Sequence, residues 1–326
     1  MTLKTIALIG APVDMGAGMR GCGMGPAALR VAGLAEALTG LGHPVLDLGD
    51  LAAAPLAGFR LGGQARAAAE IAGWTRRLET AAYEALADDC LPVFMGGDHA
   101  LSMGTVSGAV RHAASQNRPL FVLWLDAHAD FNTPATSPSG NMHGMPVAFF
   151  TGDKGFDGIL PANRPLVQPQ NVHILGVRSI DRAERRALAD AGINVHDMRA
   201  LDEHGVIAPV RALCEQVRRE NGLLHVSLDA DFLDPLLAPG VGTPVSGGAT
   251  YREAHLIMEM LADYGLVSSL DLVELNPFLD ERGKSALMLT ELAASLFGRR
   301  IFETPVVSTA RAAAHGQMPA PMLLSA

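Results

Sequence analysis

The sequence contains few cysteines, no excess of basic residues and no long hydrophobic run. Its 326 residues include three cysteines, Cys22, Cys90 and Cys214, which lie far apart and form no CxxC pair. This distribution argues against a disulfide framework and favours free thiols in a reducing compartment. There are 25 Lys and Arg residues against 34 Asp and Glu, a formal net charge of -9, so the chain lacks the basic surface of nucleic-acid-binding proteins.

The N-terminus lacks a membrane-targeting pattern as well. In MTLKTIALIGAPVD an apolar run of about five residues ends at Gly and Pro, which is too short for a signal-peptide core or a membrane span. We therefore expect a soluble, cytoplasmic protein that has neither nucleic acid nor membrane as a partner.

The chain does contain many short apolar segments. Hydrophobic residues make up 49% and charged residues 18% of the sequence, which indicates a globular chain with a large core. Continuous apolar strands that alternate with helical patterns are typical of a parallel sheet covered on both faces. The sequence therefore predicts one α/β domain over 1–326, with three layers and a mostly parallel eight-stranded sheet. Strands are expected at 5–12, 43–51, 91–99, 119–130, 171–179, 193–198, 223–235 and 266–277. Helices are expected at 26–41, 64–89, after 101, at 182–191, near 206–220, at 251–264 and at 285–297.

Two segments fall outside this alternation. Residues 132–170 are rich in Pro, Gly, Ser and Asn, and a loop of that length within a compact domain is usually functional or mobile. Residues of about 304–326 show no clear pattern and are expected to form a C-terminal tail or an intersubunit contact.

The apolar run LFVLWL is followed by ionisable residues at alternate positions, Asp126, His128 and Asp130. If the strand continued through them, all three would share one face at the carboxyl end of the sheet, where parallel sheets bind ligands. Such groups do not gather at low cost unless a positive charge holds them together. A strand end that simply emerges into solvent is the alternative.

Three other predicted strands also end in acids or histidine. Asp229 and Asp231 repeat the alternate spacing, Asp98 and His99 follow Gly96 and Gly97, and the last strand carries Asp271, Glu274 and Asn276. Four carboxylates and two imidazoles suit two divalent cations, and oxygen-rich ligation without thiolate favours Mn²⁺ over structural Zn²⁺. Paired metals acidify a bridging water, so the pattern indicates metal-assisted hydrolysis. The six candidate ligands are His99, Asp126, His128, Asp130, Asp229 and Asp231.

At these residues the sequence resembles the ureohydrolase family and, within it, the arginases. The matching segments occur in order along nearly the whole chain: LIGAPVDMGAGMRGCGMGPAALR near the start, GGDH at 96–99, DAHAD at 126–130, SLDADFLDP at 227–235, GVGTPVSGG at 240–248 and VELNP at 273–277. The resemblance implies two Mn²⁺ per chain, bridged by Asp126 and Asp229. It assigns His99 and Asp130 to one ion and His128 and Asp231 to the other, and Asp130 would also accept a hydrogen bond from a metal-bridging hydroxide.

The resemblance also implies substrate and catalytic residues. Glu274 would pair with a guanidinium group, with Thr243 beside it, and His143 would pass a proton to the leaving amine. The neutral donors of the long loop would bind an α-carboxylate, and an acid after the fifth strand would receive an α-ammonium group. These residues are Asn132, Ser139 and Asn141 for the carboxylate, and Asp181 supported by Glu184 for the ammonium. Ser179 departs from the family pattern, because a second acid often stands at that position.

The function implied is hydrolysis of L-arginine to L-ornithine and urea by a bacterial-type homo-oligomer, a trimer or a hexamer by family analogy. The alternatives are hydrolysis of another guanidino compound: a guanidino acid, a hydroxylated arginine or agmatine. A paralogue that keeps its metals without catalysis, or a single-zinc deacetylase of the same fold, fits the residues less well. A dinucleotide site at 16–21, which reads GxGxxG, is disfavoured because its glycines precede the predicted helix start at Pro26 by several residues.

Overall fold

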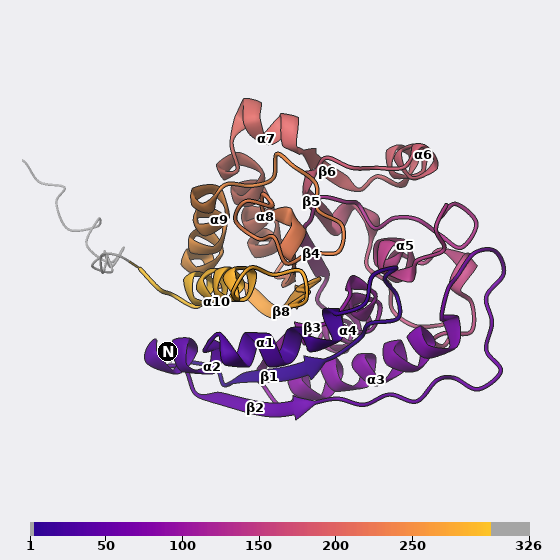
Figure 1. The fold of residues 1–326 in the computed structure, drawn as a ribbon, viewed down its shortest axis with the longest axis horizontal. Helices are drawn as coiled ribbons and strands as arrows, with labels where there is room; N and C mark the ends of the chain where they lie inside the picture. Colours follow the sequence, from indigo (N-terminus) through magenta and orange to yellow (C-terminus); the bar gives the residue numbers. More distant parts are fainter. Residues whose placement is uncertain (1–2, 301–326) are drawn as a thin grey trace, which may run out of the picture.

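A computed structural model of the protein describes residues 3–300. It contains one eight-stranded sheet in which every paired strand is parallel, in the order β2-β1-β3-β8-β7-β4-β5-β6 (Figure 1). All eight predicted strands are confirmed, and the predicted mostly parallel sheet is parallel throughout. The strands are β1 (Ile6–Ala11), β2 (Val45–Asp50), β3 (Leu91–Gly96), β4 (Leu120–Leu125), β5 (Val172–Val177), β6 (Asn194–Asp197), β7 (Leu223–Asp229) and β8 (Val267–Val273).

Helices cover both faces of the sheet, as the three-layer prediction requires. One apolar cluster joins the sheet to α3, α4 and α5, and a second joins the opposite face to α1, α2 and α7–α10. Figure 1 shows α8, α9 and α10 grouped on one side and α3 beside α4 on the other. The helices are α1 (Gly25–Val31), α2 (Leu34–Gly40), α3 (Ala68–Ala87), α4 (Ser102–Ser115), α5 (Pro146–Thr151), α6 (Arg182–Ala191), α7 (Met198–His204), α8 (Ile207–Arg219), α9 (Tyr251–Tyr264) and α10 (Lys284–Leu296).

Three local predictions need correction. The single helix expected at 26–41 is two helices, because Gly33 adopts φ 81°, a left-handed conformation that interrupts a helix. The segment 132–170 is not wholly irregular, since it contains α5 and several single turns of 3-10 helix. Helix α7 was not predicted. The tail expected at about 304–326 lies outside the described residues.

The four central strands end level with one another. Met95 of β3 pairs with Leu272 of β8, Leu272 with Leu228 of β7, and Leu228 with Leu125 of β4. These four side chains are fully buried. The residues that follow them in each strand therefore emerge side by side at the carboxyl edge of the sheet. Within residues 3–300, no helix is both long and apolar enough to cross a membrane.

Candidate active site

The six candidate metal ligands meet just beyond this aligned row. Five of them are buried and His128 is partly exposed. His99 follows β3, Asp126, His128 and Asp130 follow β4, and Asp229 is the last residue of β7, with Asp231 just after it. Strand alternation is not what brings them together, because β4 ends at Leu125 and Asp231 belongs to a 3-10 turn after β7. The convergence is predicted correctly, but its expected geometric reason is wrong.

Tight turns position these side chains instead. Asp126 Oδ1 accepts the backbone N–H of His128 at 2.6 Å, and Asp229 Oδ1 accepts that of Asp231 at 2.7 Å. Asp98 does the same with Ala100 at 3.1 Å, so each ligand-bearing segment turns around an aspartate that bonds two residues ahead. Asp130 then adopts φ 49°, a left-handed conformation that is costly for a non-glycine residue and often occurs at functional sites.

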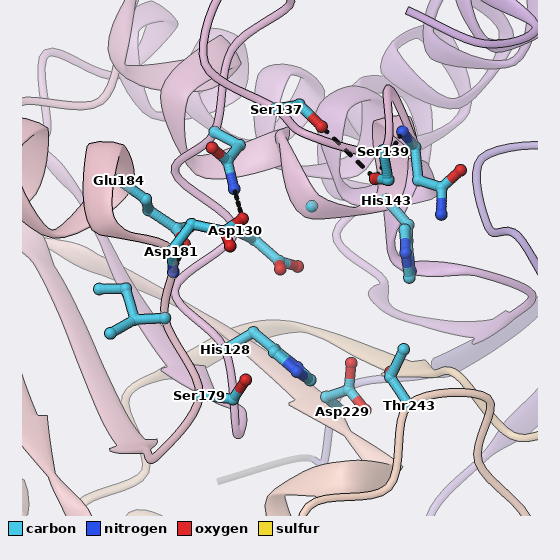
Figure 2. Close-up of a pocket in the computed structure, with 14 residues that line it drawn as sticks. His128, Asp130, Ser137, Ser139, His143, Ser179, Asp181, Glu184, Asp229 and Thr243 are labelled. Carbon is cyan, nitrogen blue, oxygen red and sulfur yellow. Dashed lines mark hydrogen bonds between the residues drawn. The ribbon is translucent and has the colours of Figure 1, made fainter.

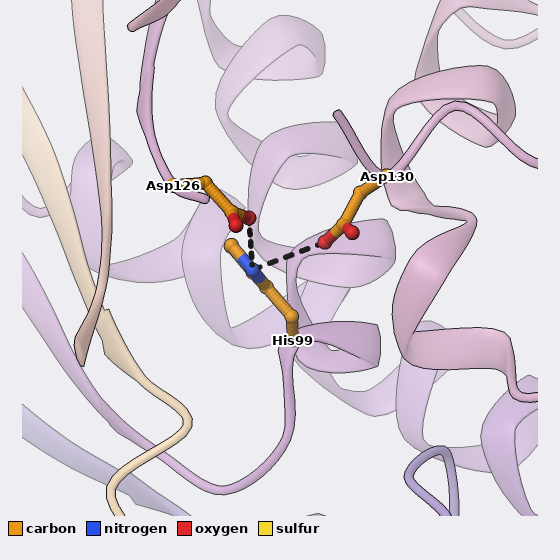
Figure 3. Close-up of side chains that lie close together, drawn as sticks. All are labelled: His99, Asp126 and Asp130. Carbon is orange, nitrogen blue, oxygen red and sulfur yellow. Dashed lines mark ion pairs between the residues drawn. The ribbon is translucent and has the colours of Figure 1, made fainter. Parts of the chain in front are cut away.

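The ligand atoms form two sets that share Asp126. His99 Nδ1 lies 3.2 Å from Asp126 Oδ2, 3.1 Å from Asp130 Oδ2 and 3.0 Å from Asp229 Oδ2, and Figure 3 shows the first two approaches. His128 Nδ1 lies 3.4 Å from Asp126 Oδ1 and 3.1 Å from Asp231 Oδ2. The two oxygens of Asp126 therefore face different histidines, as a carboxylate that bridges two cations would.

The donor chemistry fits divalent cations. His99 Nδ1 is buried and has no hydrogen-bond partner among residues 3–300, although three carboxylate oxygens surround it. Burial lowers the pKa of His99, but the surrounding carboxylates of Asp126, Asp130 and Asp229 outweigh burial and hold its pKa well above the usual range. A site that draws a proton this strongly to a buried nitrogen is one where a metal cation would also be stabilised.

The pKa values of the candidate ligand acids also indicate that positive charge is needed at this site. Burial, followed by repulsion from Asp126, raises the pKa of Asp130 to about 6. Burial and the neighbouring Asp231 and Asp126 raise the pKa of Asp229 well above its ordinary value. Among the four acids of the ligand sets, only Asp126 has a lowered pKa, because the adjacent His128 and His99 outweigh its burial. Carboxylates so crowded need cations to remain ionised together.

A second acid–histidine pair borders this cluster. His143 Nδ1 lies 2.9 Å from Glu274 Oε1, which also accepts the backbone N–H of His99 at 2.7 Å. Burial lowers the pKa of His143, but Glu274 outweighs burial and raises the pKa to about 9. Glu274 has φ 61°, a second left-handed non-glycine residue at the site. Cys22 Sγ lies 3.6 Å from its other oxygen, a contact that the sequence did not predict.

A cavity of about 300 Å³ opens above the ligands. Every predicted substrate-binding residue lines it, together with His143 and three candidate ligands (Figure 2). Glu274 is not among the lining residues and contacts His143. No Lys or Arg is among the lining residues. They are His128, Asp130, Asn132, Ser137, Ser139, Asn141, His143, Gly144, Ser179, Ile180, Asp181, Glu184, Asp229 and Thr243.

Hydrogen bonds fix the wall that carries the two acids. Asp181 begins α6 as its N-cap, and Glu184 closes the capping box by accepting the N–H of Asp181 at 3.3 Å. Glu184 also accepts the N–H of Phe131 at 2.8 Å, and Asn132 Nδ2 donates to Asp181 at 3.1 Å. The start of α6 is thereby joined to the loop after β4.

Some residues around the cluster escaped the sequence analysis. Trp124 Nε1 donates to Asp126 Oδ2 at 2.9 Å, and its ring stacks on His99 at 4.0 Å between centroids. Ser227 Oγ lies 2.8 Å from His99 Nε2. Both occur inside apolar strands, where they resemble ordinary core residues. Only their place two residues before a ligand, in WLD and SLD, was a usable signal.

Two residues predicted at this edge have other positions or partners. Asp271 is fully buried in the middle of β8, where it accepts hydrogen bonds from α4. Asn276 donates to the carbonyl of Arg20 at 3.0 Å and accepts from Phe278 N at 3.1 Å, so it holds two loops together. In the 16–21 segment, Gly16 N donates to Asp98 at 2.7 Å. It lies between β1 and α1 and not at the turn that a dinucleotide fingerprint requires.

Comparison with known proteins identifies the group to which this arrangement belongs. Residues 4–298 match the model of the arginase family. This chain belongs to the arginase family. It is 55% identical to the arginase of Agrobacterium fabrum over 92% of this chain and 93% of that protein. It is 53% identical to the arginase of Brucella melitensis over 92% and 98%. The solved native structure of the Bacillus caldovelox arginase covers 92% of this chain and 100% of its own, with a TM-score of 0.85 and 39% identity.

Membership of the arginase family makes this chain an enzyme of the amidinohydrolase class that acts on a small molecule. The recognition of the family and of its fold from the sequence is confirmed. The described residues include His and Asp groups that can bind metal ions, in the two sets described above.

Proposed function

We propose that this enzyme hydrolyses L-arginine to L-ornithine and urea with two Mn²⁺ per chain. The observation that carries the proposal is the cavity, because the buried cluster of acids and histidines lies at its floor and neutral hydrogen-bond donors lie at its wall. The arginases of Agrobacterium and Brucella support the substrate, since more than half of their aligned residues are identical to this chain.

The ligand sets divide between two ions. His99, Asp130, Asp126 and Asp229 would hold one, and His128, Asp231, Asp126 and Asp229 would hold the other. Bound in this way, a Mn²⁺ pair supplies an acidified water as the nucleophile at neutral pH. Asp130 would accept a hydrogen bond from that nucleophile and orient it. Thr243, whose hydroxyl donates to Asp231 Oδ2 at 3.2 Å, keeps the second set in place.

Two further residues balance the charge of the substrate and transfer a proton to the leaving group. Glu274 offsets the positive charge of the guanidinium, acting beside His143. His143 is exposed to the cavity and bonded to Glu274, so it is placed to hold a proton and deliver it to the leaving amine. The raised pKa of His143, about 9 through Glu274, keeps that proton on the ring at neutral pH.

The far end of the cavity reads the amino-acid end of the substrate. Asn132, Ser139 and Asn141 donate hydrogen bonds to the α-carboxylate, and Asp181 receives the α-ammonium group with Glu184 as its support. Ser179 leaves one acid fewer near the ammonium, so recognition depends on Asp181 more than in relatives that carry a second acid.

A steady-state comparison of substrates tests this assignment. Arginine, agmatine and guanidinobutyrate are compared with Mn²⁺-loaded and chelated enzyme, and arginine is expected to lead by orders of magnitude, with turnover lost on chelation. Asn141→Ala should raise the KM for arginine about tenfold and leave the KM for agmatine nearly unchanged, because agmatine lacks the carboxylate. Equal rises for both would exclude carboxylate recognition by the loop.

The alternative substrates are another guanidino acid, a hydroxylated arginine or agmatine. Agmatine turnover above that of arginine would favour the last of these. We also propose a cytoplasmic homo-oligomer, a trimer or hexamer, by analogy with the family. Light scattering coupled to size exclusion should then give a mass of three or six chains.

A further inference from the structure

A second buried polar cluster lies inside the sheet, below the candidate metal ligands. At its centre is Asp271, in the middle of β8 between Leu270 and Leu272 and fully buried. A carboxylate in such surroundings is costly unless donors surround it. The polar residues around it are also buried and come from α4, β7 and β8: Ser102, Thr105, His225, Ser227 and Ser269.

Two hydroxyl groups of α4 donate to one oxygen of this carboxylate. Ser102 Oγ and Thr105 Oγ1 each lie 2.6 Å from Asp271 Oδ2. The His225 ring lies on the other side, with Nε2 at 3.2 Å from the same oxygen. Both hydroxyl hydrogens are thus committed to Asp271, since a carboxylate only accepts.

One of these hydroxyls also leads to a candidate metal ligand. Ser102 Oγ lies 3.5 Å from Ser227 Oγ, and Ser227 Oγ lies 2.8 Å from His99 Nε2. Among residues 3–300, Thr105 makes no such contact with Ser227 or His99. A path of three polar contacts therefore runs from His99 through Ser227 and Ser102 to Asp271.

The hydrogen bonds along this path all point from His99 towards Asp271. His99 Nδ1 faces the three carboxylates, so it must present a lone pair if a cation is to bind there, and the ring hydrogen must then be on Nε2. Ser227 accepts that hydrogen and donates its own to Ser102. Ser102 cannot donate back to Ser227, because its hydroxyl hydrogen already forms a hydrogen bond with Asp271. Each group can donate only towards the buried carboxylate.

We propose that Asp271 is a positioning residue of the metal centre, acting through Ser102 and Ser227 to hold the His99 ring in the Nε2–H tautomer. The proposal deepens the function above, since it rests on His99 being a ligand. Partners that orient a ligating histidine typically change metal affinity 10–100-fold when removed. Merely anchoring α4 to β8 is the other possible role for Asp271, and in that case its two hydroxyl partners would be equivalent.

That difference provides a matched pair of variants. Ser102→Ala and Thr105→Val each remove one 2.6 Å hydrogen bond to the same oxygen, but only the first interrupts the path to His99. Mn²⁺ affinity is measured without substrate, by calorimetry on the intact, metal-depleted enzyme, and melting temperature is measured in parallel. We expect Ser102→Ala to weaken one Mn²⁺ about tenfold and Thr105→Val to change affinity less than twofold, with similar losses of melting temperature.

Ser227→Ala breaks the same path one contact nearer the ligand and should weaken Mn²⁺ binding by about 10–100-fold. It also keeps the test decisive if Ser102→Ala folds poorly. Equal losses of affinity for the Ser102 and Thr105 variants, or no loss for Ser227→Ala, would overturn the proposal. Because the readout is metal binding alone, an enzyme that binds Mn²⁺ without turning over arginine would refute the proposed substrate and leave this inference intact.

Discussion

Acidic residues on two strands of this sheet have different partners. At the outer edge, β2 carries Asp47 and Asp50, and Arg30 of α1 contacts both, at 2.8 and 2.6 Å. At the centre, Asp126 and Asp130 follow β4 and face histidines, and no Lys or Arg lies within 4 Å of them among the described residues. The outer pair is a partly exposed ion pair that the protein completes itself. The central pair is buried, and its negative charge would be balanced by a cation that is not part of the polypeptide.

The difference follows the position of each strand in the sheet. β3, β8, β7 and β4 are neighbours and almost wholly buried, whereas β2 is largely exposed and β6 alternates. The central strands lead to the candidate metal ligands and Glu274. Next to them, β5 leads to Ser179 and Asp181 of the cavity wall. Buried positions weaken screening, so acids gathered there interact strongly with each other and with any bound cation.

The largest expected effect comes from neutralising one acid in each region. Asp126→Asn removes the carboxylate shared by both ligand sets and should reduce kcat/KM for arginine by at least about 100-fold, with loss of bound Mn²⁺. Asp47→Asn, the matched change at the outer strand, should leave turnover within about twofold because exposed ion pairs contribute little. Kinetics and metal analysis of both variants check this, and comparable losses would abolish the contrast.

Removing His143, the proposed proton carrier, should separate chemistry from metal binding. His143→Ala takes away a group that bonds to Glu274 but to none of the six candidate ligands, so kcat should fall about 100-fold. The Mn²⁺ content, measured by elemental analysis, should stay at the wild-type value. A variant that loses metal would instead place His143 among the groups that hold the ions.

Truncating one leucine in each region tests the core itself. Leu125→Ala opens a cavity in a fully buried central strand and should reduce the free energy of unfolding by about 3 kcal/mol. Leu48→Ala on β2, where the side chain is 52% exposed, should change it by less than about 0.5 kcal/mol. Urea unfolding of the metal-depleted proteins measures both without the contribution of bound ions.

The smallest expected effect is a pH dependence of stability that comes from His173, in the outer part of the sheet. Burial, followed by the nearby His196, lowers the pKa of His173 on β5 to about 4. The unfolded chain, with an ordinary histidine pKa near 6.5, therefore binds more protons below that pH, and stability falls as the pH decreases from about 6.5 towards 4. Between pH 7.5 and 5.5 the loss should be about 1 kcal/mol, and His173→Gln should lack it. Urea unfolding of wild type and variant at both pH values isolates this slope from that of the carboxylates.

The sequence was most informative about features that depend on a single strand. Most of the eight strands are apolar runs bounded by Gly, Pro or Asp, and the six candidate ligands lie at the end of three of these runs or just after it. The contrast between Asp47 and Asp126 was not readable, because both are acids in or after a strand. Only the strand order shows that one lies at the edge near Arg30 and the other in the centre.

The remaining errors have equally specific causes. Asp271 looked like a strand-end acid because the sequence does not mark where β8 meets the sheet edge, and its partners Ser102 and Thr105 are remote in the chain. The alternate spacing of DAHAD suggested a continuing strand, whereas the Asp126 carboxylate bonds the backbone of His128 and turns the chain. The break at Gly33 depends on a single left-handed residue within an otherwise good helical pattern.

The contact of Trp124 with Asp126 and His99 has a practical consequence. The chain has two tryptophans, and the other, Trp74, lies on α3. In a Trp74→Phe protein the remaining indole is stacked on one candidate ligand and bonded to another, so its emission would respond to the arrival and departure of a paramagnetic ion. Tryptophan fluorescence of that variant would then follow metal loading without dye, label or substrate.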